Sequence, residues 1–264
     1  MPGRHYLPLA LFLCAAGLAG GLPVTVFGAA LTVLLAYTLV FQFRLWDDLS
    51  DQQFDRVDHP QRVLSQACSI ARFYRLEIAL FTFNLVLISL RSGSWLRLLI
   101  FLLLNGIFLL WYRWRYKLTL GAVAASHMVL IKYPVFVYLL SIQSHEAGHE
   151  TGNVPLLLSM SLVYFCFGIY EILHDRKLRS VRGAHYVLAA EMVALNAITV
   201  LMAIALLPHN GTAVLLQWTL VPVCTAVLVM MFQRHQARSE SQGGGYVIFL
   251  LGFFGVLTFA LGLS

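Results

Sequence analysis

Residues 24–58 read VTVFGAALTVLLAYTLVFQFRLWDDLSDQQFDRVD, an apolar run that leads directly into a cluster of carboxylates. Five of the chain's twelve acidic residues fall within twelve positions of this stretch, namely Asp47, Asp48, Asp51, Asp55 and Asp58. On a helix most of these side chains share one face, where like charges repel one another. Mg²⁺ removes such repulsion, and it prefers one or two carboxylates together with phosphate oxygens. The stretch therefore predicts a membrane-spanning helix followed by a Mg²⁺ and phosphate site, with a solvated acidic loop as the alternative.

The composition is that of an integral membrane protein. Of the 264 residues, 59% are apolar and only 11% are charged, and the mean hydropathy is +0.78. Such values exclude an ordinary soluble domain. Apolar runs long enough to span a bilayer lie at about 6–22, 24–43, 73–90, 95–112, 119–142, 153–173, 184–207, 211–233 and 245–263. We therefore expect an all-α, multi-pass transmembrane bundle of nine helices in a single domain, 1–264. The alternative for 6–22 is the apolar region of a signal peptide.

The distribution of Lys and Arg predicts the orientation in the membrane. With a cytoplasmic N-terminus, fifteen of the eighteen basic residues fall in inner segments, and the outer loop 143–153 contains none. Nine spans then place the C-terminus on the opposite side. The net charge of +6 is explained by this asymmetry. Binding to nucleic acid is therefore not expected, and the partner that the composition indicates is membrane lipid.

A second polar cluster follows the sixth predicted span, where residues 170–179 read YEILHDRKLR. Glu171 and Asp175 are four residues apart and share a helix face. Both clusters close an even-numbered span, so we expect them at the same, cytoplasmic membrane face. Carboxylates with neighbouring cations suit a diphosphate that is held by metal ions. When the diphosphate leaves, the rest of the substrate becomes a carbocation. Aromatic rings can stabilise that cation, or they can form an interfacial belt; the candidates are Tyr112, Trp114, Tyr116, Tyr164, Phe165, Phe167 and Tyr170.

Residues 47–62, DDLSDQQFDRVDHPQR, resemble the first aspartate-rich motif of the UbiA superfamily of intramembrane prenyltransferases. That motif runs Asn-Asp-x-x-Asp-x-x-x-Asp-Arg and is followed by a Pro and an Arg. Six positions match, and Asp47 stands where the family usually has Asn; the matching residues are Asp48, Asp51, Asp55, Arg56, Pro60 and Arg62. The nine-helix architecture is also similar to that of the family, so the resemblance covers essentially the whole chain.

The resemblance implies a transferase that moves an isoprenoid group from a prenyl diphosphate to an acceptor, with Mg²⁺ as cofactor. It implies metal ligands at Asp47, Asp48, Asp51, Asp55, Glu171 and Asp175, of which all but Asp47 are also candidate catalytic residues. Residues 112–117, YRWRYK, resemble the family's Tyr-Ser-x-x-x-Lys segment, with Arg113 in place of the Ser. The candidate substrate-binding residues are Arg62, Tyr112, Lys117, Lys132, Tyr170, Arg176 and Lys177.

The second motif departs from the family pattern, because it has fewer carboxylates and more cations. It therefore predicts either a second Mg²⁺ or basic residues that bind phosphate directly. A third alternative is a non-catalytic UbiA-like protein that binds or moves an isoprenoid or a lipid. A phospholipid-synthesising alcohol phosphotransferase also uses membrane-edge aspartates, but the Asp-Gly and Ala-Arg steps of that family are missing here.

Isolated polar residues within the spans are further candidates, because charge is costly in a bilayer. We expect Lys132 to contact phosphate, or else an internal carboxylate, and Pro134 to kink the helix beside it. A hydrogen bond in the core is expected for His127. Glu191 is a candidate for recognition of the acceptor, with pairing or protonation as the alternative, whereas Asn196 is expected to form a packing hydrogen bond.

Two further groups of residues have structural interpretations. The four cysteines lack metal-ligand spacing and are expected to be core residues. His145, Glu146, His149 and Glu150 lie in the predicted outer loop and are expected to be solvated.

Overall fold

The computed structural model describes most of the chain. The residues it describes are 6–21, 25–58, 69–92, 94–115, 117, 121–141, 153–208, 210–216, 219, 223, 252 and 255–263, without the side chains of 53–58, 92, 153, 174 and 176. Within these ranges all regular secondary structure is helical, with no strand. The all-α prediction is therefore confirmed.

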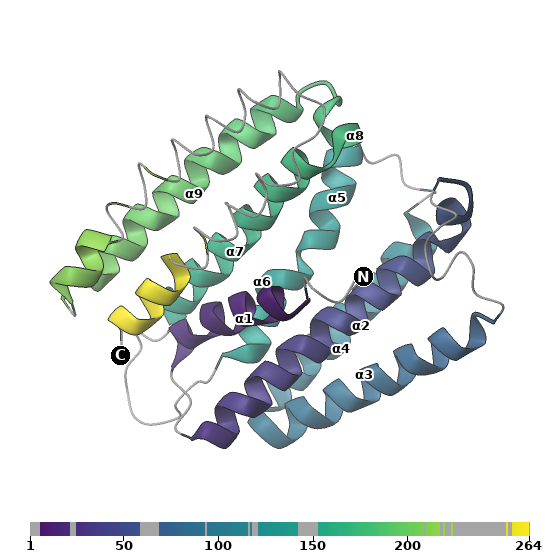
Figure 1. Cartoon of the computed structure of the whole chain (residues 1–264), viewed down its shortest axis with the longest axis horizontal. Helices are drawn as coiled ribbons and strands as arrows, with labels where there is room; N and C mark the ends of the chain where they lie inside the picture. Colours follow the sequence, from purple (N-terminus) through teal and green to yellow (C-terminus); the bar gives the residue numbers. More distant parts are fainter. Residues whose placement is uncertain are drawn as a thin grey trace. The chain divides into compact units, whose positions relative to one another are not determined.

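The chain divides into two compact units, which are described separately. Unit 1 comprises Met1–Leu11 with Val24–Trp114, and unit 2 comprises Phe12–Pro23 with Arg115–Ser264. Unit 1 contains the first residues of α1 (Tyr6–Gly17), then α2 (Val26–Asp58), α3 (Ala71–Ser92) and α4 (Trp95–Trp114) (Figure 1). Within it, α3 packs against both α2 and α4.

Unit 2 is built around α7. It contains the rest of α1, then η2 (Leu18–Gly20), α5 (Ala122–Leu130), α6 (Lys132–Leu140), α7 (Asn153–His174), α8 (Arg176–Arg179) and α9 (Ala184–Leu206). Residues 211–216 and 255–262 are also helical. Within this unit, α7 packs against α5, α6, α8 and α9, and Figure 1 shows α7 and α9 side by side.

Six of the described helices are long and apolar enough to cross a membrane. They are Val26–Gln52, Ala71–Arg91, Trp95–Trp114, Ala122–Leu140, Val154–Leu173 and Ala184–Leu206, with a shorter apolar helix at Tyr6–Gly20. The multi-pass membrane prediction is therefore confirmed. Most of the predicted spans 211–233 and 245–263 lies outside the described residues, so the count of nine stays a prediction, as does the orientation.

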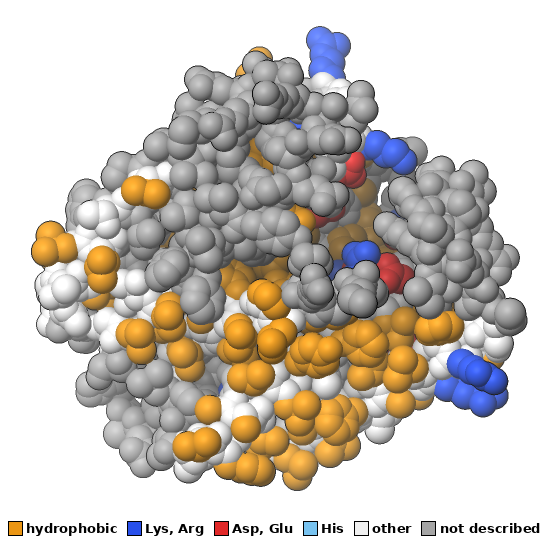
Figure 2. Space-filling model, viewed as in Figure 1, with side chains coloured by type: hydrophobic (Ala, Val, Ile, Leu, Met, Phe, Trp, Pro, Cys, Tyr) orange, Lys and Arg blue, Asp and Glu red, His pale blue; other side chains and the backbone are white. Residues whose placement is uncertain are grey.

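The outer surface of these helices is suited to lipid. Val26, Leu90 and Trp95 are 89%, 77% and 73% exposed. Large apolar side chains crowd the described surface in Figure 2, while charged side chains are few. Such a surface is unfavourable in water, but a bilayer removes that cost.

α2 is one continuous helix of 33 residues that runs through the acidic cluster. At 1.5 Å per residue it is about 50 Å long, which exceeds the roughly 30 Å hydrocarbon core of a bilayer. It ends at Asp58, two residues before Pro60. A proline disfavours the helical conformation of the residue before it, which explains a helix end at this position. The carboxylates therefore occupy the end of a membrane-spanning helix, as the sequence predicts.

The fifth span is broken at Ile131, between α5 and α6. Pro134 has no N–H, so the carbonyl of Leu130 loses its helical donor. The predicted kink is therefore confirmed. Lys132, the first residue of α6, is 3% exposed and lies 5.5 Å from the ring centroid of Tyr133.

The first apolar segment is part of the packed fold in unit 2. The hydroxyl of Ser159 on α7 donates a hydrogen bond of 2.8 Å to the carbonyl of Ala16. A Cβ on Gly17 would lie 3.2 Å from the Leu140 backbone, so this glycine permits a close approach to α6. Residues 16 and 17 are therefore packed against α7 and α6, while the transmembrane interpretation of 6–22 stays a prediction.

Candidate functional site

In unit 1, the first acidic motif is joined to α4 by Tyr112. The phenolic hydroxyl of Tyr112 donates a hydrogen bond to Oδ1 of Asp47. The Tyr112 ring lies 5.7 Å from the rings of both Trp46 and Phe108, and Phe108 contacts Phe43 at 5.3 Å. These aromatic contacts fix the register of α4 against α2. The structure thus brings Tyr112 to the first motif, although its role in binding substrate stays a prediction.

Asp48 forms an ion pair with Arg44 one turn earlier on α2. The distance from Arg44 Nη2 to Asp48 Oδ1 is 3.1 Å, and the two side chains are 48% and 29% exposed. A pair with this exposure contributes little to stability. The pair does place the guanidinium of Arg44 beside the carboxylates, where the guanidinium can also contact a phosphate.

The other predicted residues of the first motif are described only in part. Asp51 is half-buried on α2, one turn beyond Asp47. Asp55 lies in the last turns of α2, but its side chain lies outside the description, as does all of Arg62. Lys117, which belongs to unit 2, is exposed in a turn after α4.

The donor set on α2 fits Mg²⁺ only if phosphate completes the coordination. Among the described residues, no group of three His, Cys, Asp or Glu side chains converges on one point. Mg²⁺ commonly takes only one or two carboxylates and receives its other oxygens from phosphate and water. The role of the α2 carboxylates as Mg²⁺ ligands stays a prediction.

A buried polar network below the motif was not predicted from the sequence. Asn84 donates to Gln42 Oε1 at 2.8 Å, Gln42 donates to Asn105 Oδ1 at 3.0 Å, and the Thr38 hydroxyl donates to Asn84 Oδ1 at 2.5 Å. Gln42 and Asn84 are 0% exposed. Amide side chains inside a bilayer need such partners, so this network fastens α2, α3 and α4 together. Its sequence signal was the occurrence of amides within apolar spans.

Glu77 on α3 is a second residue that the sequence analysis missed. Its carboxylate interacts with the side chain of Gln42 and electrostatically with Asp47. Oxygen Oε2 is buried and has no hydrogen-bond partner among the described residues. A lone carboxylate inside the predicted span 73–90 was the signal that could have identified it.

In unit 2, the second motif lies where α7 gives way to α8. Glu171 is half-buried in the last turn of α7, and its carbonyl accepts the Asp175 N–H at 2.9 Å. The carboxylate oxygen Oδ1 of Asp175 accepts the backbone N–H of Lys177 at 2.7 Å. Asp175 thereby caps α8 while remaining partly exposed. Arg176 and Lys177 begin α8, and the Lys177 side chain is exposed.

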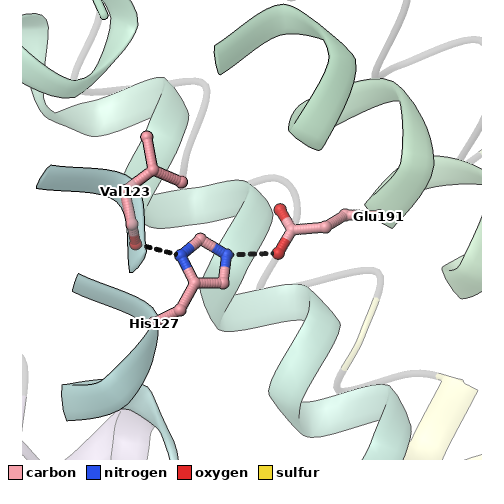
Figure 3. A network of polar contacts seen from close by, with 3 residues as sticks. All are labelled: Val123, His127 and Glu191. Atoms are coloured by element: carbon pink, nitrogen blue, oxygen red, sulfur yellow. Dashed lines mark hydrogen bonds and ion pairs between the residues drawn. The ribbon is translucent and has the colours of Figure 1, made fainter. Parts of the chain in front are cut away.

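An intramembrane acid and base pair lies further along the same unit. In Figure 3, the imidazole of His127 on α5 points to the carboxylate of Glu191 on α9, and Nε2 lies 2.6 Å from Oε1. The other ring nitrogen, Nδ1, lies 2.7 Å from the carbonyl oxygen of Val123. The side chains of His127 and Glu191 are only 15% and 6% exposed. The predicted core hydrogen bond of His127 is confirmed, and so is pairing as the alternative for Glu191.

One aromatic side chain of α7 contacts this pair, and another stacks on a ring of α6. The ring of Tyr164 meets His127 edge-on at 6.2 Å. Phe167 stacks on Tyr133 at 3.6 Å with an interplanar angle of 7°. Tyr164 and Phe167 are two of the predicted aromatic candidates, and their role in stabilising a carbocation stays a prediction. Tyr170 is half-buried on α7 and its role stays a prediction.

The remaining predictions have mixed outcomes. Cys14 and Cys166 are buried free thiols, as expected of core residues. Asn196 donates to the Met192 carbonyl of its own helix at 2.8 Å. Trp114 is 47% exposed, which is consistent with an interfacial position. Tyr116 and the outer loop with His145 lie outside the described residues.

Comparison with known proteins identifies the fold. No family model matches the sequence, and no curated protein matches it. Among solved structures, the chain is similar to the apo structure of a UbiA homologue from Aeropyrum pernix K1, with 15% sequence identity. The match covers 100% of this chain and 98% of that chain, with a TM-score of 0.72. The chain therefore has the fold of the UbiA superfamily.

Proposed function

We propose that this protein is an intramembrane prenyltransferase, which transfers an isoprenoid group from a prenyl diphosphate to an acceptor. The observation that carries the proposal is the acidic end of α2, where Asp47, Asp48 and Asp51 follow a membrane span in a UbiA-like fold. Tyr112 and Arg44 already engage two of these carboxylates. A polar site at the end of an apolar helix suits a substrate with a charged head and a hydrocarbon tail.

In unit 1, the proposed Mg²⁺ ligands are Asp48, Asp51 and Asp55, with Asp47 as a further candidate. When bound, Mg²⁺ neutralises charge that develops on the departing diphosphate. Tyr112 holds Asp47 in place through its hydrogen bond, and Arg44 offers a cation to phosphate. Arg62 is a further proposed phosphate ligand.

In unit 2, Glu171 and Asp175 are proposed ligands of a second Mg²⁺. Arg176 and Lys177 are proposed to bind phosphate, as are Lys117 and Lys132. Buried aromatic rings such as Phe167 keep water away from a carbocation and offer it their π-faces. The apolar helices accommodate the prenyl chain.

One observation favours a second candidate function, in which the protein binds or moves an isoprenoid or lipid without transferring it. Asp175 uses one carboxylate oxygen to cap α8, which leaves fewer acceptor positions for a metal in an already short motif. Such a protein binds prenyl diphosphate but does not cleave it.

The proposed function is tested by removing the metal. Purified protein in lipid nanodiscs is supplied with labelled geranylgeranyl diphosphate, a set of lipid-soluble acceptor candidates and Mg²⁺, and inorganic pyrophosphate is measured with and without EDTA. We expect EDTA to stop pyrophosphate release and excess Mg²⁺ to restore it, because the carboxylates need the metal to bind the diphosphate. Binding without cleavage favours the second candidate, and equal cleavage in EDTA contradicts the proposed role of Mg²⁺.

A further inference from the structure

The His127–Glu191 pair holds one shared proton within the bundle. The carbonyl of Val123 can only accept, so the Nδ1 atom that contacts it carries a hydrogen. A contact of 2.6 Å between Nε2 and Oε1 then requires one further proton between the two atoms. Whether this proton resides on nitrogen or on oxygen, the pair has no net charge. Its neutrality explains how two ionisable side chains are accommodated in a membrane-spanning bundle.

The second carboxylate oxygen of Glu191 is the unusual feature of this pair. Glu191 is 4% exposed, and its Oε2 atom has no hydrogen-bond partner among the described residues. Buried carboxylate oxygens are nearly always supplied with a donor, because leaving one unpaired costs free energy. Oε2 can only accept unless it becomes protonated, so a matching ligand has to bring a hydroxyl or similar donor.

Helix α7 has a glycine, Gly168, where the carboxylate of Glu191 packs against it. A Cβ at Gly168 of α7 would lie 2.2 Å from Glu191 Oε1 and 3.1 Å from Oε2, so only glycine leaves room. Tyr164, Gly168 and Glu171 follow one another at i, i+4 and i+7, and they therefore share one face of α7. Tyr164 lies against His127, and Glu171 is close enough to His127 to interact electrostatically.

This shared face connects the pair to the second motif. Glu171 lies three residues beyond Gly168, a rise of about 4.5 Å along a helix. The pair therefore lies deeper in the apolar part of α7 than the proposed diphosphate ligands of unit 2. In a prenyl transfer, the acceptor reacts at the hydrocarbon side of the diphosphate, and this is the side on which the pair lies.

We propose that Glu191 is the catalytic base of the transfer, and that it takes a proton from a neutral hydroxyl group of the acceptor. His127 is the positioning residue, because it holds the carboxylate through Oε1 and leaves Oε2 to the acceptor. The assignment rests on the proposed prenyl transfer. A neutral, lipid-soluble alcohol or phenol is favoured over an anionic acceptor, because a carboxylate oxygen that lacks a nearby donor repels a second anion.

The proposed step balances in atoms and charge. The C1–O bond of the prenyl diphosphate breaks, and its electron pair leaves with the diphosphate. The hydroxyl oxygen of the acceptor forms the new bond to C1, which gives a prenyl ether, and the hydroxyl proton moves to Oε2 of Glu191. The protonated pair then has one positive charge, and it returns to neutrality when the proton leaves for water.

The test compares the wild-type protein with Glu191→Gln. Glutamine has the same shape, and its amide can donate to Nε2 of His127 while its oxygen accepts the acceptor hydroxyl, but it cannot take the proton. The acceptor probes are 4-heptylphenol and dioleoylglycerol, with 4-heptylanisole as a matched compound that lacks the hydroxyl. Ether product and total pyrophosphate are measured together, so that transfer to the probe is separated from transfer to water.

We expect Glu191→Gln to lower kcat for ether formation by about 100-fold or more with little change in KM, because only proton transfer is lost. His127→Asn is expected to lower the same kcat, since Glu191 then loses its orientation. The control is Gly211→Ala, where an added Cβ meets nothing within 4 Å; this variant is expected to behave as wild type.

The outcomes distinguish this assignment from the function on which it rests. Failure of the wild-type protein to cleave the diphosphate with Mg²⁺ overturns the proposed function and the assignment with it. Wild-type cleavage with an unchanged ether yield in Glu191→Gln overturns the role of Glu191 alone. Cleavage without ether from either hydroxyl probe overturns the neutral hydroxyl class.

Discussion

Asp51→Asn and Asp48→Asn are each expected to lower Mg²⁺-dependent pyrophosphate release from geranylgeranyl diphosphate by at least about 100-fold. Each substitution removes one negative charge from the proposed metal site on α2 while preserving the shape of the side chain. A bound metal contributes several kcal/mol of charge stabilisation, and each 1.36 kcal/mol corresponds to a factor of ten in rate. The measurement is initial velocity in nanodiscs over a range of Mg²⁺ concentrations.

The melting temperature separates this effect from unfolding. The ion pair of Asp48 joins it to a half-exposed Arg44 in the same helix, and the loss of such an exposed pair costs at most about 1 kcal/mol. Both variants are expected to melt close to wild type, and Glu150→Gln, in the predicted outer loop, is expected to retain wild-type velocity. Full velocity in both motif variants contradicts the assignment of these carboxylates to Mg²⁺.

Gly168→Ala is expected to lower the stability of the protein by several kcal/mol, because it separates Glu191 from His127. The new Cβ would lie 2.2 Å from Oε1 of Glu191. The carboxylate has to move away from Nε2 of His127, which leaves a buried charge or polar group unpaired. Breaking a buried pair costs about 3–5 kcal/mol. The measurement is the melting temperature or the denaturant midpoint in detergent.

Gly106→Ala on α4 is the matched control. An added Cβ there meets nothing within 4 Å, and alanine is favoured over glycine inside a helix by about 0.5–1 kcal/mol. A slight stabilisation is therefore expected. In a Glu191→Ala background, Gly168→Ala is expected to cost far less than it does in the wild type. An equal cost in both backgrounds shows that the glycine serves some other contact.

The features that the sequence predicted are those that have a local signal. Runs of apolar residues predicted the spans, and the density of carboxylates around Asp51 predicted the polar end of α2. Pro134 predicted the break in the fifth span, because the missing N–H acts within the same helix. Each of these features depends on neighbours along the chain. The structure confirms the apolar helices, the helical acidic end of α2 and the break in the fifth span.

The partner of each buried polar residue was not predicted, because it depends on contacts between distant helices. His127 and Glu191 are 64 residues apart, and no spacing rule links them. Gln42 and Asn105 are 63 residues apart, so each appeared only as an isolated amide in an apolar run. The need for glycine at position 168 could not be predicted either, because it arises from the close approach of Glu191 on α9. Pairing of this kind is fixed by helix packing, which a single sequence does not reveal.

The central claim is that the acidic end of α2 binds a divalent metal together with a prenyl diphosphate. The most direct test is pulsed electron paramagnetic resonance of Mn²⁺ in place of Mg²⁺, with the non-cleavable geranylgeranyl thiolodiphosphate as ligand. The predicted result is protein-bound Mn²⁺ with phosphorus hyperfine coupling in the wild type, and loss of both in the Asp48→Asn, Asp51→Asn double variant. Unchanged Mn²⁺ binding and phosphorus coupling in the double variant would contradict the claim.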